Sequence, residues 1–261
     1  MKNEIGIGIL DVHSNEMLEK CLKSIPEDLK ESVLVVSNKL KTNNNYKNYD
    51  KQVPFATLRN YLINQMRINN KKYYFLLNSN VELIDVDFFT KIIKLAETFG
   101  TWFLTGTGKG TSISVEDDST NISLEVSPHL NTNVLFLYSG IIKNFGFFDE
   151  RFYNTKDLDV IDYINRLREK EVYPPKHHNP TIGTGLVLET DSDIEKINYR
   201  EIPKSQTGYK PDDDKSMELS IAYFYHKYKY VPNQTEPAGT TQQELLNFME
   251  KLQKNYASTK L

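Results

Sequence analysis

Cysteine is almost absent from this chain of 261 residues, since Cys21 is the only one. A single cysteine excludes an internal disulfide and a cysteine-based zinc site, and it fits a reducing compartment. Long apolar runs are also missing. The first run, residues 5–10, is followed by Asp11 and is too short for a signal peptide or a membrane span. We therefore expect a soluble, cytoplasmic protein with Cys21 packed in its interior.

The chain also lacks a large excess of positive or negative charge, because the formal net charge is −3 and the sequence pI is about 6.0. There is no overall basic field of the kind that attracts nucleic acid, so we expect no nucleic-acid partner. Apolar residues make up 39% of the chain and charged residues 26%. This composition is ordinary for a globular protein, and the length suits one large domain or two small ones.

Alternating strand and helix patterns fill the first hundred residues. Short apolar runs predict strands at residues 5–10, 33–36 and 73–77. Apolar side chains at helical spacing predict helices at residues 15–24, 55–68 and 85–99. Strands that alternate with helices form parallel pairs, so we expect an α/β sheet here, with a polar loop over residues 38–51.

The second half of the sequence has shorter strands and a helical tail. Strands are predicted at residues 102–105, 112–115, 122–126 and 134–138, with a hairpin between the middle two. Helices are predicted at residues 157–170, 216–228 and 242–256. We expect the last of these helices to dock on the parent domain and not on a partner protein.

Four motifs follow one another in a recognisable order: IGIGILDVHSN, VLVVSN, ATLRNYLI, and FGFFDERF before an acidic helix. In this order they resemble family 2-like nucleotide-sugar glycosyltransferases of the GT-A fold, over roughly residues 4–180. The tail AYFYHKYKYVPN is similar to that of short viral and bacterial members, although Lys229 replaces a glycine. The resemblance implies a Rossmann-like, mainly parallel sheet flanked by helices over residues 1–205, with a helical extension, residues 206–261, packed on it.

In such a sheet the nucleotide lies in a crevice at the carboxyl ends of the strands. The resemblance implies nucleotide contacts from Asp11, His13, Asn38, Arg59 and Asn78. Asp11 can accept a hydrogen bond from a base edge or a ribose hydroxyl, and its alternative role is to cap the first helix. Arg59 has the planar fork that suits phosphate, and its alternative is a surface salt bridge.

The strand at 73–77 is followed by Asn78, Ser79 and Asn80. By resemblance the two asparagines occupy the positions of the aspartates of the DxD motif, which bind Mg²⁺ or Mn²⁺. An asparagine oxygen carries no charge, so we expect Asn80 and His178 to bind a metal only weakly. Three explanations stay open: basic side chains replace the metal, the phosphates of the substrate hold a weakly bound ion, or the chain is a pseudoenzyme.

Several carboxylates follow the FDERF motif. An inverting transferase needs one carboxylate to take the proton of the acceptor hydroxyl. The resemblance places this base among Asp157, Asp159 and Asp162, with Asp149 and Glu150 on the acceptor side. The register that uses Asp159 and Asp162 also supplies the expected arginine, Arg166, which can pair with Asp162. The alternative is that these aspartates cap and solubilise the start of a helix.

These residues predict a glycosyltransferase that moves a sugar from a nucleotide-diphosphate sugar, with a UDP-sugar expected first, to a hydroxyl of a glycan or another acceptor. The alternative is a catalytically inactive GT-A-like binding or structural module of a larger assembly, such as a phage particle. The turn at residues 78–80 distinguishes the two, because it decides whether a metal can assist the reaction. The sequence does not specify the donor sugar, the acceptor, the linkage or the oligomeric state.

Overall fold

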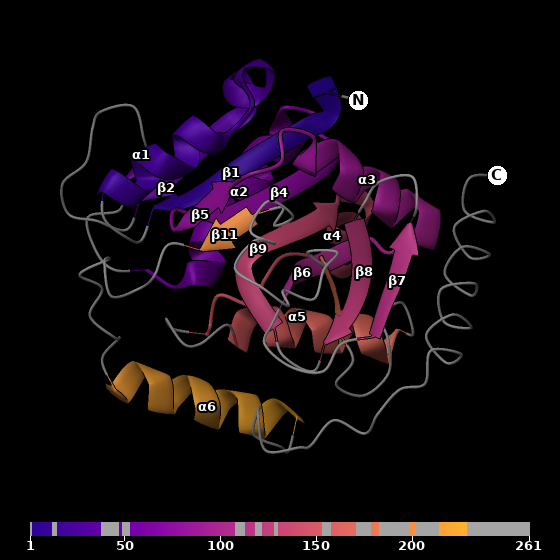
Figure 1. Cartoon of the computed structure of the whole chain (residues 1–261). Coiled ribbons are helices and arrows are strands. Elements are labelled where there is room, and N and C mark those ends of the chain that lie inside the picture. The colour runs from indigo at the N-terminus through magenta and orange to yellow at the C-terminus, as the bar shows by residue number, and fades with distance from the viewer. Residues whose placement is uncertain are drawn as a thin grey trace, which may run out of the picture.

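The computed structural model describes residues 2–11, 15–37, 47–48, 53–107, 113–117, 122–127, 130–152, 158–170, 179–182, 199–201 and 214–228. Within them lies a nine-stranded mixed sheet with helices on both faces (Figure 1). The strand order is β3-β2-β1-β4-β9-β6-β10-β8-β7. Their bounds are β1 Ile5–Asp11, β2 Val33–Ser37, β3 Lys47–Asn48, β4 Tyr73–Asn78, β6 Phe103–Thr107, β7 Ile113–Asp117, β8 Ile122–Ser127, β9 Leu130–Tyr138 and β10 Asn179–Ile182.

The first half of the sheet is parallel. β1 pairs in parallel with β2 on one side and with β4 on the other, and β2 pairs in parallel with β3. The register aligns Asp11 with Ser37 and Leu10 with Asn78. The carboxyl ends of β1, β2 and β4 therefore meet at one edge, which we call the carboxyl edge.

Antiparallel ladders extend the sheet beyond β4. β9 runs antiparallel to both β4 and β6, and β7 and β8 form the predicted hairpin. β10 lies between β6 and β8, parallel to the first and antiparallel to the second. A separate two-stranded sheet joins β5, Val81–Leu83, to β11, Tyr199–Glu201.

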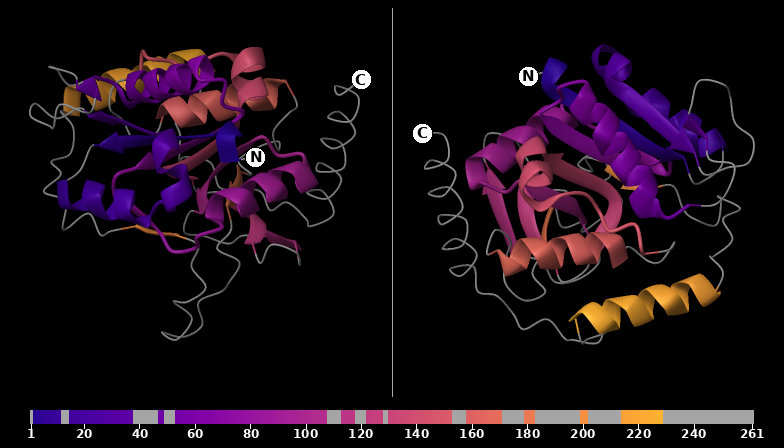
Figure 2. Two further views of the ribbon diagram at one scale, coloured as in Figure 1. Left: turned by 90° about the horizontal axis from the view of Figure 1, so that it is seen from above. Right: turned by 180° about the vertical axis from the view of Figure 1, so that it is seen from behind.

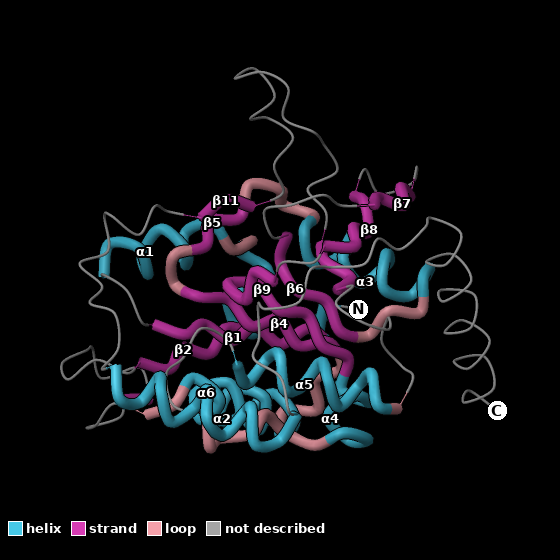
Figure 3. Tube along the Cα trace, turned by 90° about the horizontal axis from the view of Figure 1, so that it is seen from below, coloured by secondary structure: helices cyan, strands magenta, loops and turns pink. Residues whose placement is uncertain are grey.

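The helices form two layers. α2, α4, α5 and α6 cover one face of the sheet, and α1 and α3 cover the other (Figures 2 and 3). Their bounds are α1 Asn15–Ser24, α2 Phe55–Ile68, α3 Phe88–Phe99, α4 Ser139–Phe145, α5 Leu158–Glu169 and α6 Asp214–Tyr228. No helix within the described ranges is long and apolar enough to cross a membrane.

The sequence of β1, IGIGILD, explains why α2 lies so close to the sheet. Its isoleucines belong to the core cluster that also contains α1 and α3 residues, whereas its glycines face α2. A Cβ atom on Gly8 would lie only 2.9 Å from Cδ1 of Leu62 and 3.0 Å from Cβ of Leu62. Glycine therefore permits a contact between helix and strand that a larger side chain would prevent.

The fold class is confirmed as α/β, and most predicted elements are present. The predicted helix at 55–68 coincides with α2, and the helices predicted at 157–170 and 216–228 correspond to α5 and α6. The sequence analysis missed α4, β5, β10 and β11, and it placed β3 inside a loop. The helix predicted at 242–256 lies outside the described residues. The domain boundary at 205 stays a prediction, although α6 does pack on α5.

Candidate functional site

Buried polar side chains gather at the carboxyl edge. Asp11, Ser37, Ser79 and Asn80 have no exposed surface, and Asn78 is 9% exposed. The backbone N–H of Ser79 donates to the carbonyl oxygen of Leu10 over 3.0 Å, which ties the turn after β4 to the end of β1. The hydroxyl of Ser37 donates to the backbone carbonyl of Asp11 over 3.3 Å. Three neighbouring strands thus place polar groups together, as expected for a ligand site in an open α/β sheet.

Asn78 and Asn80 differ in their hydrogen bonding. Nδ2 of Asn78 donates to Oδ1 of Asn133 over 2.7 Å, which connects β4 to β9. Neither Nδ2 nor Oδ1 of Asn80 has a hydrogen-bond partner within the described part of the chain, and the same holds for the hydroxyl of Ser79. A buried polar group without a partner costs about 1–3 kcal/mol, so such groups usually mark a place for a ligand or a water molecule.

The turn at residues 78–80 is a poor fit for a divalent cation. Mg²⁺ and Mn²⁺ prefer charged oxygen ligands, and all three side chains of the turn are neutral. Among the described residues there is no group of three or more His, Cys, Asp or Glu side chains that could hold a metal ion. The donor groups here therefore suit hydrogen bonding better than metal coordination.

Arg59 is buried, at 1% exposure, and pairs with Asp159. α2 follows β2 and precedes the parallel strand β4, so it runs back across the sheet and its first turns lie near the carboxyl edge. The pair thereby connects this edge to the first turn of α5. The sequence analysis named a surface salt bridge as the alternative for Arg59, but the pair in the structure is an internal one.

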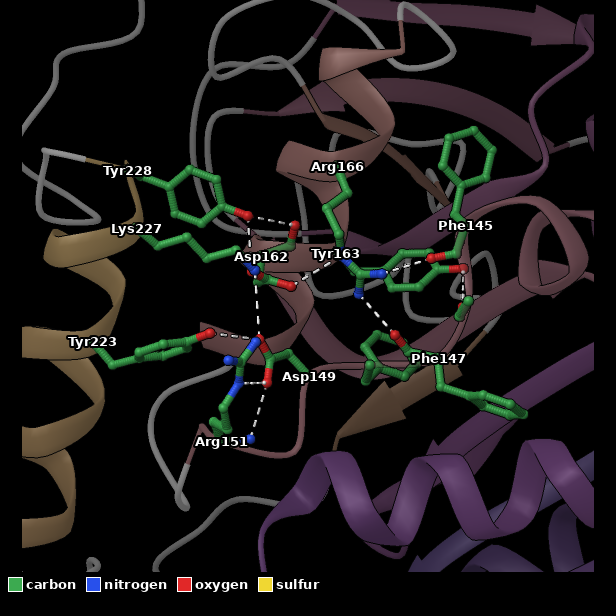
Figure 4. A network of polar contacts seen from close by, with 12 residues as sticks. Phe145, Phe147, Asp149, Arg151, Asp162, Tyr163, Arg166, Tyr223, Lys227 and Tyr228 are labelled. Carbon is green, nitrogen blue, oxygen red and sulfur yellow. Dashed lines mark hydrogen bonds and ion pairs between the residues drawn. The ribbon is translucent and has the colours of Figure 1, made fainter.

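Asp162 is fully buried in α5 and both of its carboxylate oxygens accept hydrogen bonds (Figure 4). Oδ2 accepts from Nε of Arg166 over 3.1 Å, which confirms the expected pairing within the helix. Oδ1 accepts from Nζ of Lys227 and, over 2.8 Å, from the hydroxyl of Tyr228. Both of these donors come from α6. Asp162 therefore fastens α6 to α5.

Arg166 also holds the segment that precedes α5. Its Nη1 donates to the carbonyl of Phe145 over 2.7 Å and its Nη2 to the carbonyl of Phe147 over 2.8 Å (Figure 4). The hydroxyl of Tyr163 donates to the carbonyl of Gly146 over 3.0 Å. Side chains of α5 thus fix the carboxyl end of α4 and the next two residues, which together begin the FGFFDERF motif.

Asp149 lies next to this network, with 11% of its side chain exposed. It accepts hydrogen bonds from Arg151 and, over 3.0 Å, from the hydroxyl of Tyr223 in α6. Burial alone would raise the pKa of Asp149, but these hydrogen bonds outweigh it and hold the pKa well below the ordinary 3.8. Burial and the bond to Asp149 raise the pKa of Tyr223 to about 12.

Glu150 is exposed and is contacted by the first turns of α2. Nδ2 of Asn60 donates to Oε1 of Glu150 over 2.8 Å and to the carbonyl of Phe148 over 2.9 Å, and the N–H of Phe148 donates back to Asn60. The hydroxyl of Thr57 donates to Oε2 of Glu150 over 3.2 Å. Glu150, one of the two residues proposed for the acceptor side, is therefore held by side chains of α2.

The structure brings some predicted residues together and leaves others undescribed. Asp11, Asn78 and Asn80 meet at the carboxyl edge, while Asp159 and Asp162 lie in the first two turns of α5. The predicted residues His13, Asn38, Asp157 and His178 lie outside the described residues.

The sequence analysis missed Asn60, Asn133, Tyr223, Lys227 and Tyr228. A signal was available for Tyr223 and Lys227, because they are four residues apart and so share one face of the predicted helix at 216–228. No such local signal pointed to Asn133.

Similarity to known proteins was found only at the level of structure. No protein-family model matches the chain, and no curated protein sequence matches it. GalNAc-T7, solved with UDP, GalNAc and Mn²⁺, superposes with a TM-score of 0.53 at 10% identity, covering 95% of this chain and 54% of that one. The chain has a GT-A-like fold.

Two further solved structures superpose with lower TM-scores. The mannosyltransferase PcManGT from Pyrobaculum calidifontis, in complex with GDP-Man and Mn²⁺, has a TM-score of 0.40 at 8% identity, covering 56% of this chain and 48% of that one. A cytidylyltransferase from Leptospira borgpetersenii has a TM-score of 0.38 at 12% identity, covering 90% and 99%. The chain spans about half the length of the two glycosyltransferases.

Proposed function

We propose that the protein is a glycosyltransferase, similar to family 2, that transfers a sugar from a nucleotide-diphosphate sugar to an acceptor hydroxyl with inversion. The supporting observation is the buried polar cluster at the carboxyl edge, above all the Asn80 amide, which has no partner among the described residues. A ligand that hydrogen-bonds to this amide would remove the cost of its burial. A UDP-sugar is the donor we propose first, with a glycan or another hydroxyl compound as acceptor.

The nucleotide side of the site is proposed to use Asp11, Asn78 and Asn80, together with His13 and Asn38. Arg59 receives a different role from the one expected for a phosphate ligand. Its charge is already met by Asp159 in a buried pair, so we propose that Arg59 positions α5 relative to the carboxyl edge. Asp149 and Glu150 are proposed to line the acceptor side.

The general base is proposed to be Asp157. Asp159 is paired with Arg59, and both oxygens of Asp162 accept hydrogen bonds from other side chains. A carboxylate held in this way is poorly placed to accept a proton from a substrate. Asp157 immediately precedes α5 in the sequence and is the remaining candidate among the three aspartates that the resemblance named.

A second candidate function is nucleotide-sugar binding without turnover. The observation in its favour is that the ion pairs of Asp159 and Asp162 are buried and join secondary-structure elements, so these aspartates have a structural role. A chain that kept the fold for binding would preserve such pairs and would not need a base at Asp157.

One experiment separates the two functions. Purified protein is mixed with UDP-glucose, UDP-GlcNAc or GDP-mannose and a panel of hydroxyl acceptors, and both binding and release of the nucleoside diphosphate are measured. The transferase predicts acceptor-dependent release that falls by about 10²–10⁴-fold in Asp157→Asn. Asp87→Asn, at an exposed position, is the matched control.

Each other outcome has a definite meaning. Binding without release, equal in wild type and Asp157→Asn, would replace the transferase by the binding module. Absence of binding to every nucleotide sugar would reject both functions.

A further inference from the structure

The turn after β4 offers a donor and an acceptor where the fold family is expected to offer charge. Asn80 has no exposed surface, and neither Nδ2 nor Oδ1 of its amide has a partner within the described ranges. The hydroxyl of Ser79 is also buried and also has no hydrogen-bond partner within those ranges. Asn78 is different, because its Nδ2 already donates to Asn133. The unmatched groups of the turn are therefore concentrated at Ser79 and Asn80.

The chemistry of an amide limits what these groups can bind. A carboxylate only accepts hydrogen bonds and attracts a cation, whereas an amide donates through nitrogen and accepts through oxygen. A metal ion at Asn80 would use the oxygen alone and would leave Nδ2 buried without a partner. A phosphate oxygen would use the nitrogen alone. A hydroxyl group satisfies both, because it can donate to Oδ1 and accept from Nδ2.

The electrostatics agree with this choice. Asn78, Ser79 and Asn80 are neutral, and a divalent ion needs charged oxygen ligands to offset the loss of its hydration shell. On the neighbouring strand, Asp11 pairs in register with Ser37 and adds a carboxylate at this edge. A carboxylate beside neutral amides and hydroxyls suits a ribose or a sugar as ligand, because the hydroxyl groups of such a ligand can donate hydrogen bonds to the carboxylate.

From these observations we infer that Asn80 binds its ligand directly through a hydroxyl group, of the ribose or of the donor sugar, and that this binding needs no divalent cation. The inference rests on the proposed function, since it names how the same edge recognises a nucleotide sugar. Asn80 then contributes to recognition of the nucleotide sugar by direct hydrogen bonds and does not act as a metal ligand.

Titration calorimetry with UDP-glucose, UDP, uridine and 2′,3′-dideoxyuridine, each in EDTA and in Mn²⁺, tests the inference. We expect the Kd of UDP-glucose in EDTA to lie within about threefold of its Kd in Mn²⁺. Asn80→Ala should weaken binding by about fivefold or more in both buffers, since two hydrogen bonds are lost. If UDP and uridine keep this sensitivity and 2′,3′-dideoxyuridine loses it, the hydroxyl belongs to the ribose. If dideoxyuridine keeps it, the contact is with the base and the inference is overturned. If only UDP-glucose shows the sensitivity, the hydroxyl belongs to the sugar.

Asn80→Asp is a second variant, in which a carboxylate that can bind a cation replaces the neutral amide. The new carboxylate should make binding of UDP-glucose tighter in Mn²⁺ than in EDTA by about tenfold or more, and Mn²⁺ alone should raise the melting temperature of this variant. Asn144→Asp adds the same charge at an exposed position of α4 and should show neither effect. Circular dichroism checks that each variant is folded.

The outcomes separate this inference from the function on which it rests. Wild-type binding that is more than tenfold tighter in Mn²⁺ would overturn the inference and leave the proposed function standing. Metal-independent binding that Asn80→Ala leaves unchanged would overturn the role of Asn80. If no probe binds in either buffer, the proposed function fails and the inference fails with it.

Discussion

The guanidinium of Arg59 in α2 pairs with the carboxylate of Asp159 in α5, and the exposed fractions of the two side chains are only 2% and 5%. The aromatic rings of Phe55 and Phe148 lie 5.7 Å and 5.8 Å from the guanidinium carbon. Two charges enclosed in this way depend on each other, because neither has water to replace its partner. The pair therefore fixes α5 relative to the edge that carries the proposed nucleotide site.

Replacing Arg59 by methionine should be strongly destabilising. The change leaves Asp159 with its main cation removed, and we expect the free energy of unfolding to fall by about 3–5 kcal/mol, measured by urea denaturation. The double variant Arg59→Met, Asp159→Leu should recover most of this loss, since no buried charge is left unpaired. Arg67→Met, at an exposed position of the same helix, should change stability by about 0.5 kcal/mol or less. Equal losses in Arg59→Met and Arg67→Met would contradict this role.

Phe224 should account for much of the attachment of α6. It is fully buried, and its ring centroid lies 6.1 Å from that of Phe152 and 4.8 Å from that of Tyr228. We expect Phe224→Ala to lower the free energy of unfolding by about 3–5 kcal/mol. The neighbouring Tyr225 is 53% exposed, so Tyr225→Ala serves as the control and should cost about 0.5 kcal/mol or less. Hydrogen exchange of α6 amides should speed up in the first variant only.

Asp149 should make the stability of the protein depend on acid pH. Its pKa in the folded state lies below the ordinary 3.8, so it stabilises the fold above that pH, and the contribution is lost as the pH falls below it. Wild type should therefore be more stable than Asp149→Asn near neutral pH, and the difference should shrink below about pH 4. Arg151 is 70% exposed, so water screens its part of this effect.

Thermal unfolding of both proteins across this pH range measures the effect, with Asp87→Asn as the exposed control. A stability difference between wild type and Asp149→Asn that stays constant from neutral to acid pH would show that the carboxylate has no shifted pKa.

The thiol of Cys21 should be inert in the folded protein. It is fully buried, and burial raises its pKa to about 12. Because the thiolate is the reactive form, labelling with a disulfide reagent at mildly alkaline pH should be slower by more than about 100-fold in buffer than in concentrated guanidinium. As the only cysteine, Cys21 gives one signal per chain. Rapid labelling of the folded protein would place the thiol at the surface.

Hydrophobic spacing predicted the elements whose own residues carry the pattern. The helix over Phe55–Ile68 was predicted with both of its ends, because its apolar face repeats every three or four residues. α4, Ser139–Phe145, was missed, because a helix of seven residues is too short to show that repeat. β10, Asn179–Ile182, was missed for a similar reason, since it is a strand only through its pairing with β6 and β8.

Some features of the candidate site could also be predicted from the sequence, and others could not. Asp11 and Asn78 could be placed at strand ends from the sequence, since the carboxyl ends of parallel strands meet at one edge. Their burial, and the unmatched amide of Asn80, could not be predicted, because both depend on what packs around the turn. The family resemblance supplied roles for Asp159 and Asp162, but their neighbours were unknown.

The sequence by itself determined the order of the longer strands and helices in the first hundred residues, the α/β class and the neutral turn at residues 78–80, because these depend on residues that are close together in the chain. It did not give the short strands β3 and β5, which are defined by their pairing partners. The tertiary structure decided which charges meet. Arg59 and Asp159 are 100 positions apart, and Lys227 and Asp162 are 65 apart. Only the packing of α2, α5 and α6 on one face of the sheet brings such groups into contact and removes the water that would otherwise solvate them.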